Sequence, residues 1–296
     1  MMEKITTLEK ASRLVRSGSS IAIGGFTVYR KPMAFVRQLL RDDVRDLTLL
    51  GWSSGIDVDM LAGAGGLRRV EVSYVGLDFL GLAPSYRRAV ENGELQVIEY
   101  TELTSAARFK AGSMGMTFFP AKSLFGSDVL KHNPDIREFK CPFTGEMFHA
   151  VPAAKPDVTI LHAPMADVYG NVVYLPTSNR NIEWDIPMAE CAGKVVVTVE
   201  KIVDYNYVLS APLLVKIPRF KVDAVVELPY GAHPTDHDSY YKMDKEHLRI
   251  YAEASRSPEA FKRYLDEYVY GPSDHWEYME KVGGIKRMMK LRPAGG

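Results

Sequence analysis

Hydrophobic positions along this chain follow two spacings, one typical of buried strands and one typical of helices that bury a single face. The predicted strands of the N-terminal half are the short aliphatic runs 21–23, 47–50, 70–75 and 95–100. Apolar residues at helical spacing predict helices that start at Leu8 (ended by Gly18), Met33, Asp57, Pro84 and Thr104. Strands that alternate with helices at short intervals predict βαβ units. We therefore expect an α/β fold, an open and mainly parallel sheet with flanking helices.

The second half of the chain resumes this pattern after an interruption at 122–148. That segment has little periodicity and is interrupted by Gly126, Pro134, Pro142 and Gly145. We expect it to be an irregular excursion on the surface or at a subunit interface. Strand-like runs return at 158–162, 172–174, 194–199 and 224–227, and amphipathic helices follow at 246–254 and 258–268.

The bulk composition narrows the class of protein. The 296 residues are enough for one large α/β domain, which we expect over 1–283, followed by a short tail over 284–296. The basic cluster 286–292 predicts either the solvated face of a last short helix or a frayed tail. Thirty-seven basic and 37 acidic residues balance, so a nucleic-acid or membrane partner is not expected.

Cysteine content and apolar runs predict the compartment. Cys141 and Cys191 give neither a disulfide framework nor metal-ligand spacing, and no metal site is predicted. The N-terminal segment is polar and amphipathic, and no run approaches the roughly 18 apolar residues of a membrane-spanning helix. We expect a soluble cytoplasmic protein. Phosphate-loop, nucleophile-elbow and dinucleotide-binding motifs are also absent from the sequence.

Candidate chemistry begins where the first predicted strand ends, at Gly24, Gly25, Phe26 and Thr27. Glycine permits a positive φ and the close approach of a ligand or another backbone. The carboxyl edge of an open α/β sheet is also where ligands bind. A tight turn explains the two glycines equally well. Arg30 and Lys31 follow, either as partners for a substrate carboxylate or as ordinary surface cations.

Three further residues follow predicted strands. Asp78 comes after 70–75, as the N-cap of a turn or as a substrate-facing carboxylate. Glu102 lies just before a predicted helix, where an acid also suits the helix dipole. His233 lies in a glycine turn, where a structural hydrogen bond is the alternative to a catalytic role. His237 is four positions from His233, but Pro234 argues against a helix that would let both bind a metal.

A set of motifs in this order is similar to the A subunit of glutaconate-type family I CoA-transferases. The motifs are 24–27 with 30–32, 44–48, 115–120, 142–146, 160–163 and 228–234. The resemblance runs from about residue 5 to about residue 283. It implies the CoA-transferase (Rossmann-like) fold, a CoA thioester as substrate with no bound cofactor, and a separate B subunit that carries the nucleophilic glutamate. An αβ dimer or an α2β2 tetramer is implied.

The resemblance also implies roles for the residues named above. The loop 24–27 would donate hydrogen bonds to the thioester oxygen, in a ping-pong transfer through an enzyme–CoA thioester. Glu102 falls where related steroid ring-cleaving acyl-CoA hydrolases carry a catalytic base, so hydrolysis of a carbon–carbon bond in a cyclic oxo-acyl-CoA is the alternative. Decarboxylation of an acyl-CoA is a third possible reaction. The non-enzymatic hypothesis is a module that binds a sugar phosphate or an effector. Phe79, Leu80 and Leu82 suggest either an apolar acyl group or core packing.

Overall fold

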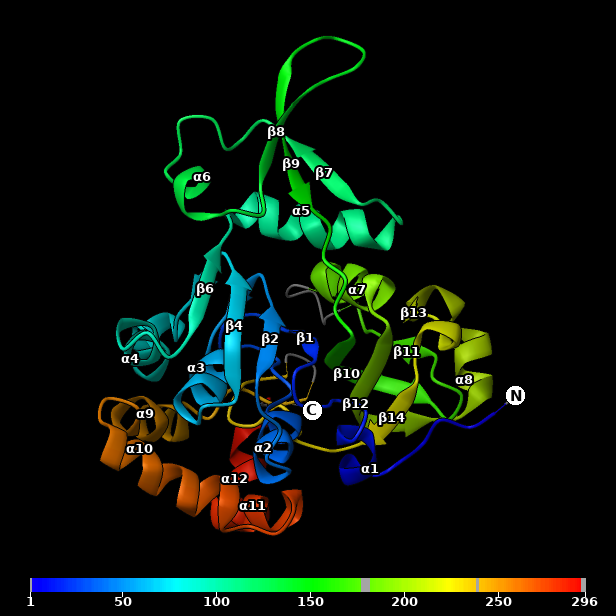
Figure 1. Cartoon of the computed structure of the whole chain (residues 1–296). Coiled ribbons are helices and arrows are strands. Elements are labelled where there is room, and N and C mark those ends of the chain that lie inside the picture. Colours follow the sequence, from blue (N-terminus) through cyan, green and yellow to red (C-terminus); the bar gives the residue numbers. More distant parts are fainter. Residues whose placement is uncertain (1, 177–181, 238–239, 294–296) are drawn as a thin grey trace.

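The computed structural model describes residues 2–176, 182–237 and 240–293 (Figure 1). Its centre is a large sheet in which parallel strands run in the order β14, β12, β10, β1, β2, β4, β6. The bounds of these strands are Ala224–Glu227, Lys194–Val203, Val158–Asp167, Ser20–Ile23, Leu47–Leu50, Leu67–Val72 and Gln96–Glu99. Beyond the end of β1, β10 pairs antiparallel with β11 (Val172–Val173), which pairs with β13 (Val215–Ile217). The predicted α/β fold with a mainly parallel sheet is confirmed.

Helices cover both faces of the sheet. Ile21 and Ile23 of β1 pack with α2 (Met33–Arg41) in the largest core cluster. Ala22, between them in sequence, faces the opposite way and packs near Phe109 of α5 (Glu102–Ser113). Side chains of a strand alternate between its faces, so β1 separates two helical layers. The remaining helices are α1 (Leu8–Ser12), α3 (Ile56–Gly63), α4 (Pro84–Glu91), α7 (Ile182–Cys191), α8 (Tyr205–Ser210), α9 (Lys245–Ala254), α10 (Pro258–Leu265), α11 (His275–Lys281) and α12 (Gly284–Leu291).

The ends of several elements differ from the prediction. Helix α5 begins at Glu102 because Thr101 is its N-cap and shares reciprocal hydrogen bonds with Thr104. Helix α7 was not predicted, since Pro187 in its middle is typical of a helix boundary and buried Asp185 interrupts the apolar spacing. The predicted strand 70–75 is divided into β4 and the short β5 (Tyr74–Val75), which pairs with β3 (Ser53–Ser54).

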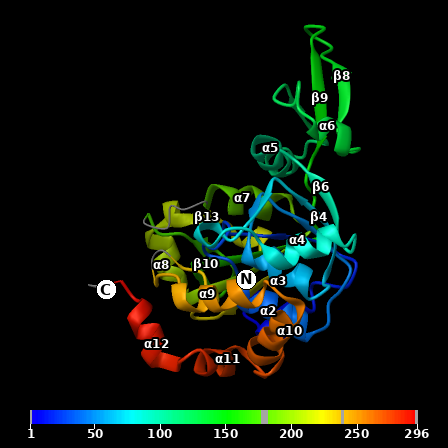
Figure 2. The same cartoon turned by 90° about the vertical axis from the view of Figure 1, so that its left-hand side faces the viewer.

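The segment 122–148 is more regular than expected. Its strands β8 (Arg137–Lys140) and β9 (Met147–Pro152) pair antiparallel, β9 pairs with β7 (Phe118–Ala121), and α6 (Val129–His132) lies between β7 and β8 in sequence. This small sheet projects away from the main one (Figure 2). The prediction of an irregular excursion is therefore wrong in its secondary structure, because exposed strands such as β8 lack the apolar runs that reveal buried ones.

Residues 286–291 of the basic cluster lie in helix α12 rather than in a frayed tail. Arg287 of α12 forms ion pairs with Asp244 (2.5 Å) and Glu246 (2.7 Å), and Met288 packs against Tyr278. Residues 294–296 of the predicted tail lie outside the described residues. Across the described ranges, none of the helices combines the length and apolar character needed to cross a bilayer.

Candidate functional site

The candidate site lies at the carboxyl edge of the sheet, where the segments after β1, β2 and β6 meet. Ser53 follows β2, and its Oγ donates a 2.6 Å hydrogen bond to Glu102 Oε1 at the first turn of α5. The Ser53 carbonyl accepts the amide of Thr27, which follows β1 (3.1 Å). Ser53 is buried and Glu102 is exposed, so the carboxylate is held at the surface of this edge.

The backbone amides of the glycine loop are already hydrogen-bonded within the chain. The acceptors are Ile160 O for Gly24 (2.9 Å), Asp185 Oδ1 for Gly25 (3.1 Å), Tyr29 O for Phe26 (2.9 Å) and Ser53 O for Thr27 (3.1 Å). These partners favour the alternative of a tight turn over donation of these amides to a thioester oxygen. The Thr27 hydroxyl is different, because it is buried and has no hydrogen-bond partner among the residues that the structure describes.

The two glycines allow a close approach between this loop and its surroundings. A Cβ on Gly24 would lie 2.5 Å from Leu161 Cδ2 and 2.6 Å from Asp185 Oδ1. Gly25 has a φ of 77°, and a Cβ there would meet the Tyr29 and Arg30 carbonyls at 2.6 Å. Both positions therefore exclude larger residues for reasons of packing.

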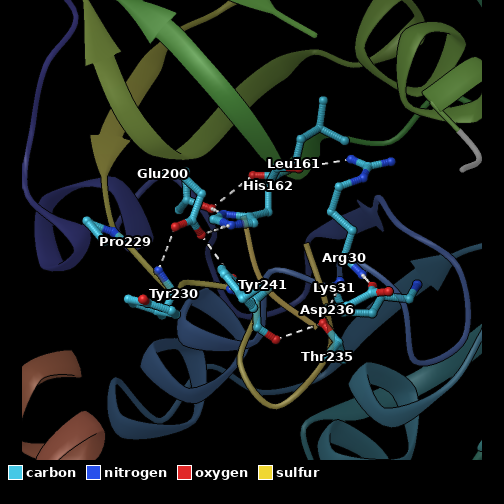
Figure 3. Close-up of polar contacts among 12 residues, drawn as sticks. Arg30, Lys31, Leu161, His162, Glu200, Pro229, Tyr230, Thr235, Asp236 and Tyr241 are labelled. Carbon is cyan, nitrogen blue, oxygen red and sulfur yellow. Dashed lines mark hydrogen bonds and ion pairs between the residues drawn. The ribbon is translucent and has the colours of Figure 1, made fainter. Parts of the chain in front are cut away.

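Arg30 and Lys31 are buried beside carboxylates of the same chain. The Arg30 guanidinium pairs with Asp185. It also donates a 2.9 Å hydrogen bond to the His162 carbonyl (Figure 3). The Lys31 Nζ lies 2.9 Å from Asp57 Oδ2, without the alignment of a hydrogen bond. Both cations are buried, so neither is an ordinary surface cation, and their pairing with Asp185 and Asp57 favours a structural role over binding of a substrate carboxylate.

Asp185 is the shared acceptor of this buried network. Besides Arg30 and the Gly25 amide, it accepts a 2.9 Å hydrogen bond from the Tyr174 hydroxyl. Burial, together with the Asp185 charge, raises the pKa of Tyr174 well above its usual value, so Tyr174 stays a donor. These contacts of Asp185 hold the loop after β1 in place against α7.

Aromatic rings stand beside the glycine loop. The Phe26 and Trp52 ring centroids are 5.4 Å apart, and those of Trp52 and Trp184 are 4.3 Å apart. The Trp52 indole N–H is buried, and within the described ranges it has no acceptor. Three elements that are distant in sequence thus form one aromatic wall, defined here as Phe26, Trp52 and Trp184.

Among the described residues, neither His233 nor Asp78 forms a hydrogen bond or an ion pair with Glu102. His233 is fully buried, with Nδ1 2.8 Å from the Tyr278 hydroxyl and Nε2 3.2 Å from Asp244. Burial lowers the pKa of His233, and its contacts join the turn after β14 to the C-terminal helices, which favours the alternative of a structural hydrogen bond. Asp78 is exposed and opens a 3-10 turn (Asp78–Leu80) whose N-cap is Leu77, so it is not an N-cap.

A second buried carboxylate, that of Glu200, lies within β12 beside His162 of β10. His162 Nε2 lies 2.8 Å from Glu200 Oε1, which also accepts the Tyr241 hydroxyl (2.9 Å), while Glu200 Oε2 accepts the Tyr230 amide (2.9 Å) (Figure 3). Because these donors occupy both carboxylate oxygens, we interpret Glu200 as a structural tie. No group of three His, Cys, Asp or Glu side chains arranged to hold a metal ion is found in 2–176, 182–237 and 240–293.

Sequence reasoning did not single out Ser53, Trp184 or Asp185. Ser53 directly follows a predicted buried strand at the ligand-binding edge, and that position was its available signal. Trp184 and Asp185 lie in α7, which was not predicted, so no signal placed them opposite the glycine loop.

Comparison with known proteins identifies relatives along almost the whole chain. Residues 5–228 match the family model described as Coenzyme A transferase. The A subunit of glutaconate CoA-transferase from Acidaminococcus fermentans is 33% identical, with 100% of this chain and 96% of that protein covered. The cholesterol ring-cleaving hydrolase IpdA subunit of Rhodococcus jostii is 32% identical, with 93% and 95% covered.

Two further findings concern length and structure. An uncharacterized protein of Archaeoglobus fulgidus is 39% identical over 99% of this chain, which spans only 65% of that relative's length. The crystal structure of glutaconate coenzyme A-transferase from Acidaminococcus fermentans superposes with a TM-score of 0.93 at 32% identity and covers 99% of this chain and 96% of its own.

Proposed function

The chain belongs to the coenzyme A transferase family, and we propose that it is the A subunit of a hetero-oligomeric enzyme that moves CoA between carboxylic acids. The observation that carries this proposal is the match to the A subunit of glutaconate CoA-transferase over nearly the full length of both chains. The substrate is a CoA thioester rather than a resident cofactor. The free thiols of Cys141 and Cys191 support the expectation of a reducing, cytoplasmic location.

The proposed reaction divides the site between two subunits. The thioester carbonyl is attacked by a glutamate of the B subunit, and the tetrahedral oxyanion collapses to an anhydride and CoA thiolate. The thiolate then attacks the glutamyl carbonyl, which releases the first acid and leaves an enzyme–CoA thioester. An acceptor carboxylate then attacks the enzyme–CoA thioester, and the same steps in reverse order give the acceptor's CoA thioester and the free glutamate. This chain supplies Thr27, whose buried hydroxyl has no partner among the described residues, and it donates to the oxyanion once binding of the thioester and the B subunit exposes it.

Glu102 favours a second candidate, hydrolysis of a carbon–carbon bond in a cyclic oxo-acyl-CoA. Its exposed carboxylate is oriented by Ser53 at the carboxyl edge of the sheet, a position suited to taking a proton from water. The hydroxide so formed adds to a ring ketone, and the adjacent ring bond breaks to give a carboxylic acid and a carbanion. The carbanion then takes the proton that Glu102 had accepted from water, which completes the addition of water across the broken bond. The similarity to the cholesterol ring-cleaving hydrolase IpdA subunit supports this alternative.

Acceptor dependence separates the two reactions. The chain is purified in complex with its B subunit, then given an acyl-CoA with and without acetate, and the thioesters are separated by chromatography. Formation of acetyl-CoA in proportion to the acyl-CoA consumed is expected. Release of free CoA or of a ring-opened thioester at the same rate without acetate would contradict the transferase proposal.

A further inference from the structure

The charge balance of the site bears on which acyl group it accepts. A dicarboxylic acyl group needs a fixed cation for its distal carboxylate, because an unpaired buried carboxylate is strongly unfavourable. The two cations of the loop after β1 are Arg30 and Lys31, and their charges are balanced by Asp185 and Asp57 inside the protein. The loop therefore presents no accessible positive charge to an acyl group.

The surface that the loop does present is apolar. Phe26, Trp52 and Trp184 pack as one wall, and Trp184 is partly exposed. Leu103, the residue after Glu102, is 58% exposed. Flat aromatic faces bury large areas of a ring or a branched chain and give a carboxylate no favourable partner.

A groove continues this apolar surface between α5 and α7. It has a volume of about 460 Å³ and begins at Leu103, beside Glu102. Its other lining residues include Ala106, Ala107, Phe119, Trp184 and Ile186. Two charged residues of opposite sign, Glu183 and Lys110, also line the groove. Their charges balance, so the groove offers no net positive charge to the distal carboxylate of a dicarboxylic acyl group.

We infer that this site accepts an apolar, bulky acyl group, with a branched, alicyclic or aromatic chain, in preference to a short dicarboxylic one. The acyl chain lies along the aromatic wall and in the groove between α5 and α7, and its thioester carbonyl lies near Thr27 and Glu102. This assignment rests on the proposed function, because it concerns the acyl-CoA of the same site.

The test compares two thioesters on the complex of this chain with its B subunit. Total consumption of cyclohexanecarbonyl-CoA and of glutaryl-CoA is followed with acetate present and absent. We expect kcat/KM for cyclohexanecarbonyl-CoA to be at least about tenfold higher. A preference for glutaryl-CoA would overturn the inference while leaving the transferase proposal intact. Consumption without acetate would overturn the transferase proposal, and the ranking of the two thioesters would still decide this inference.

A binding measurement decides the case in which neither thioester turns over. Trp52 and Trp184 both belong to the aromatic wall. The third tryptophan of the chain, Trp276, is removed by Trp276→Phe, so that the tryptophan fluorescence of this chain comes from the wall alone. Cyclohexanecarboxylate is expected to change this fluorescence at concentrations at least about tenfold lower than glutarate. The reverse order, or no response to either acid, would overturn the inference.

Two variants identify the residues responsible. Trp184→Ala is expected to lower the preference for cyclohexanecarbonyl-CoA about tenfold, whereas Trp276→Ala, at a 53% exposed position on α11, leaves it unchanged. Leu103→Lys places a cation next to Glu102 at an exposed position that tolerates the change in the fold. It is expected to raise kcat/KM for glutaryl-CoA several-fold. Unchanged selectivity in Leu103→Lys and Trp184→Ala would contradict the assignment.

Discussion

Ser53 donates a 2.6 Å hydrogen bond to the carboxylate of Glu102, 49 residues further along the chain. The contact joins the segment after β2 to the first turn of α5, across the edge where the carboxyl ends of the parallel strands meet. It orients the exposed carboxylate of Glu102. The two candidate reactions differ in whether this carboxylate is the catalytic base. Each prediction below starts from a contact of this kind.

Removal of the Ser53 hydroxyl tests whether the oriented acid drives the reaction. In the transferase account, Ser53→Ala keeps acceptor-dependent transfer within about tenfold of wild type, because the nucleophile belongs to the B subunit. A catalytic acid or base contributes about 10²–10⁴-fold, so a loss of that size, equal to that of Glu102→Ala, would favour hydrolysis. Ser54→Ala, at the neighbouring buried serine, is the matched control for packing changes.

The Thr27 hydroxyl is predicted to act on the reaction and not on stability. Thr27→Val keeps the branched shape and removes a buried oxygen that has no partner in the described part of the chain. We expect kcat to fall about 10²-fold, the size seen for one oxyanion donor, with an unchanged urea midpoint. Thr27→Ser restores a hydroxyl and is expected to recover most of the activity. An equal kcat for Thr27→Val and wild type would exclude the oxyanion role.

The Arg30–Asp185 pair is predicted to stabilise the loop rather than bind substrate. Asp185→Ala leaves Arg30 as a buried charge and also deprives the Tyr174 hydroxyl and the Gly25 amide of their acceptor. We expect the free energy of unfolding to fall by about 3–5 kcal/mol in urea titrations.

An exposed ion pair provides the control for this effect. Glu91 pairs with Arg87 on the surface of α4, and Glu91→Ala is expected to change stability by less than about 1 kcal/mol. Equal effects for Glu91→Ala and Asp185→Ala would contradict the assignment of a buried, stabilising network.

Buried histidines predict a loss of stability in acid. Burial, reinforced by the nearby Arg37 charge, lowers the pKa of His275 from 6.5 to about 3, and burial does the same for His247. Below pH 6.5 these histidines therefore bind protons in the unfolded chain but not in the folded chain. The contribution of these two histidines to stability is full above pH 6.5 and falls as the pH drops toward 3, by about 2 kcal/mol per histidine at pH 5.

Denaturant unfolding at several pH values checks this sign. His275→Gln keeps a donor for the Pro229 carbonyl, which His275 Nε2 contacts at 2.9 Å, and is expected to reduce the slope between pH 6.5 and 5. His132→Gln replaces an exposed histidine and should leave the slope unchanged. A slope that His275→Gln does not alter would contradict the prediction.

The sequence predicts the scaffold well because the information is local. The runs at 21–23 and 47–50 are buried parallel strands, and the residues after them reach the ligand-binding edge as parallel topology requires. Glu102 was placed between a strand and a helix, and the Thr101 cap sets that boundary.

The chemistry of the loop could not be predicted because its partners are distant. Asp185 lies 155 residues after Arg30, on a helix that the sequence pattern did not predict. It neutralises the charge of Arg30, which the sequence alone suggests as a binding partner for a substrate carboxylate. Three of the four loop amides, those of Gly24, Gly25 and Thr27, also find acceptors on other segments. Local pattern indicates where a site lies, whereas long-range pairing decides which of its groups are available.

Mass spectrometry of the B subunit tests the central claim most directly. The complex is incubated with an acyl-CoA in the absence of an acceptor acid, and the intact masses of both subunits are recorded. The account predicts a CoA adduct on a glutamate of the B subunit, which acetate discharges and which still forms with Glu102→Ala. Glu259→Ala, at an exposed acid in the first turn of α10, is the control variant. Absence of any adduct, with acceptor-independent turnover that Glu102→Ala abolishes, would contradict it.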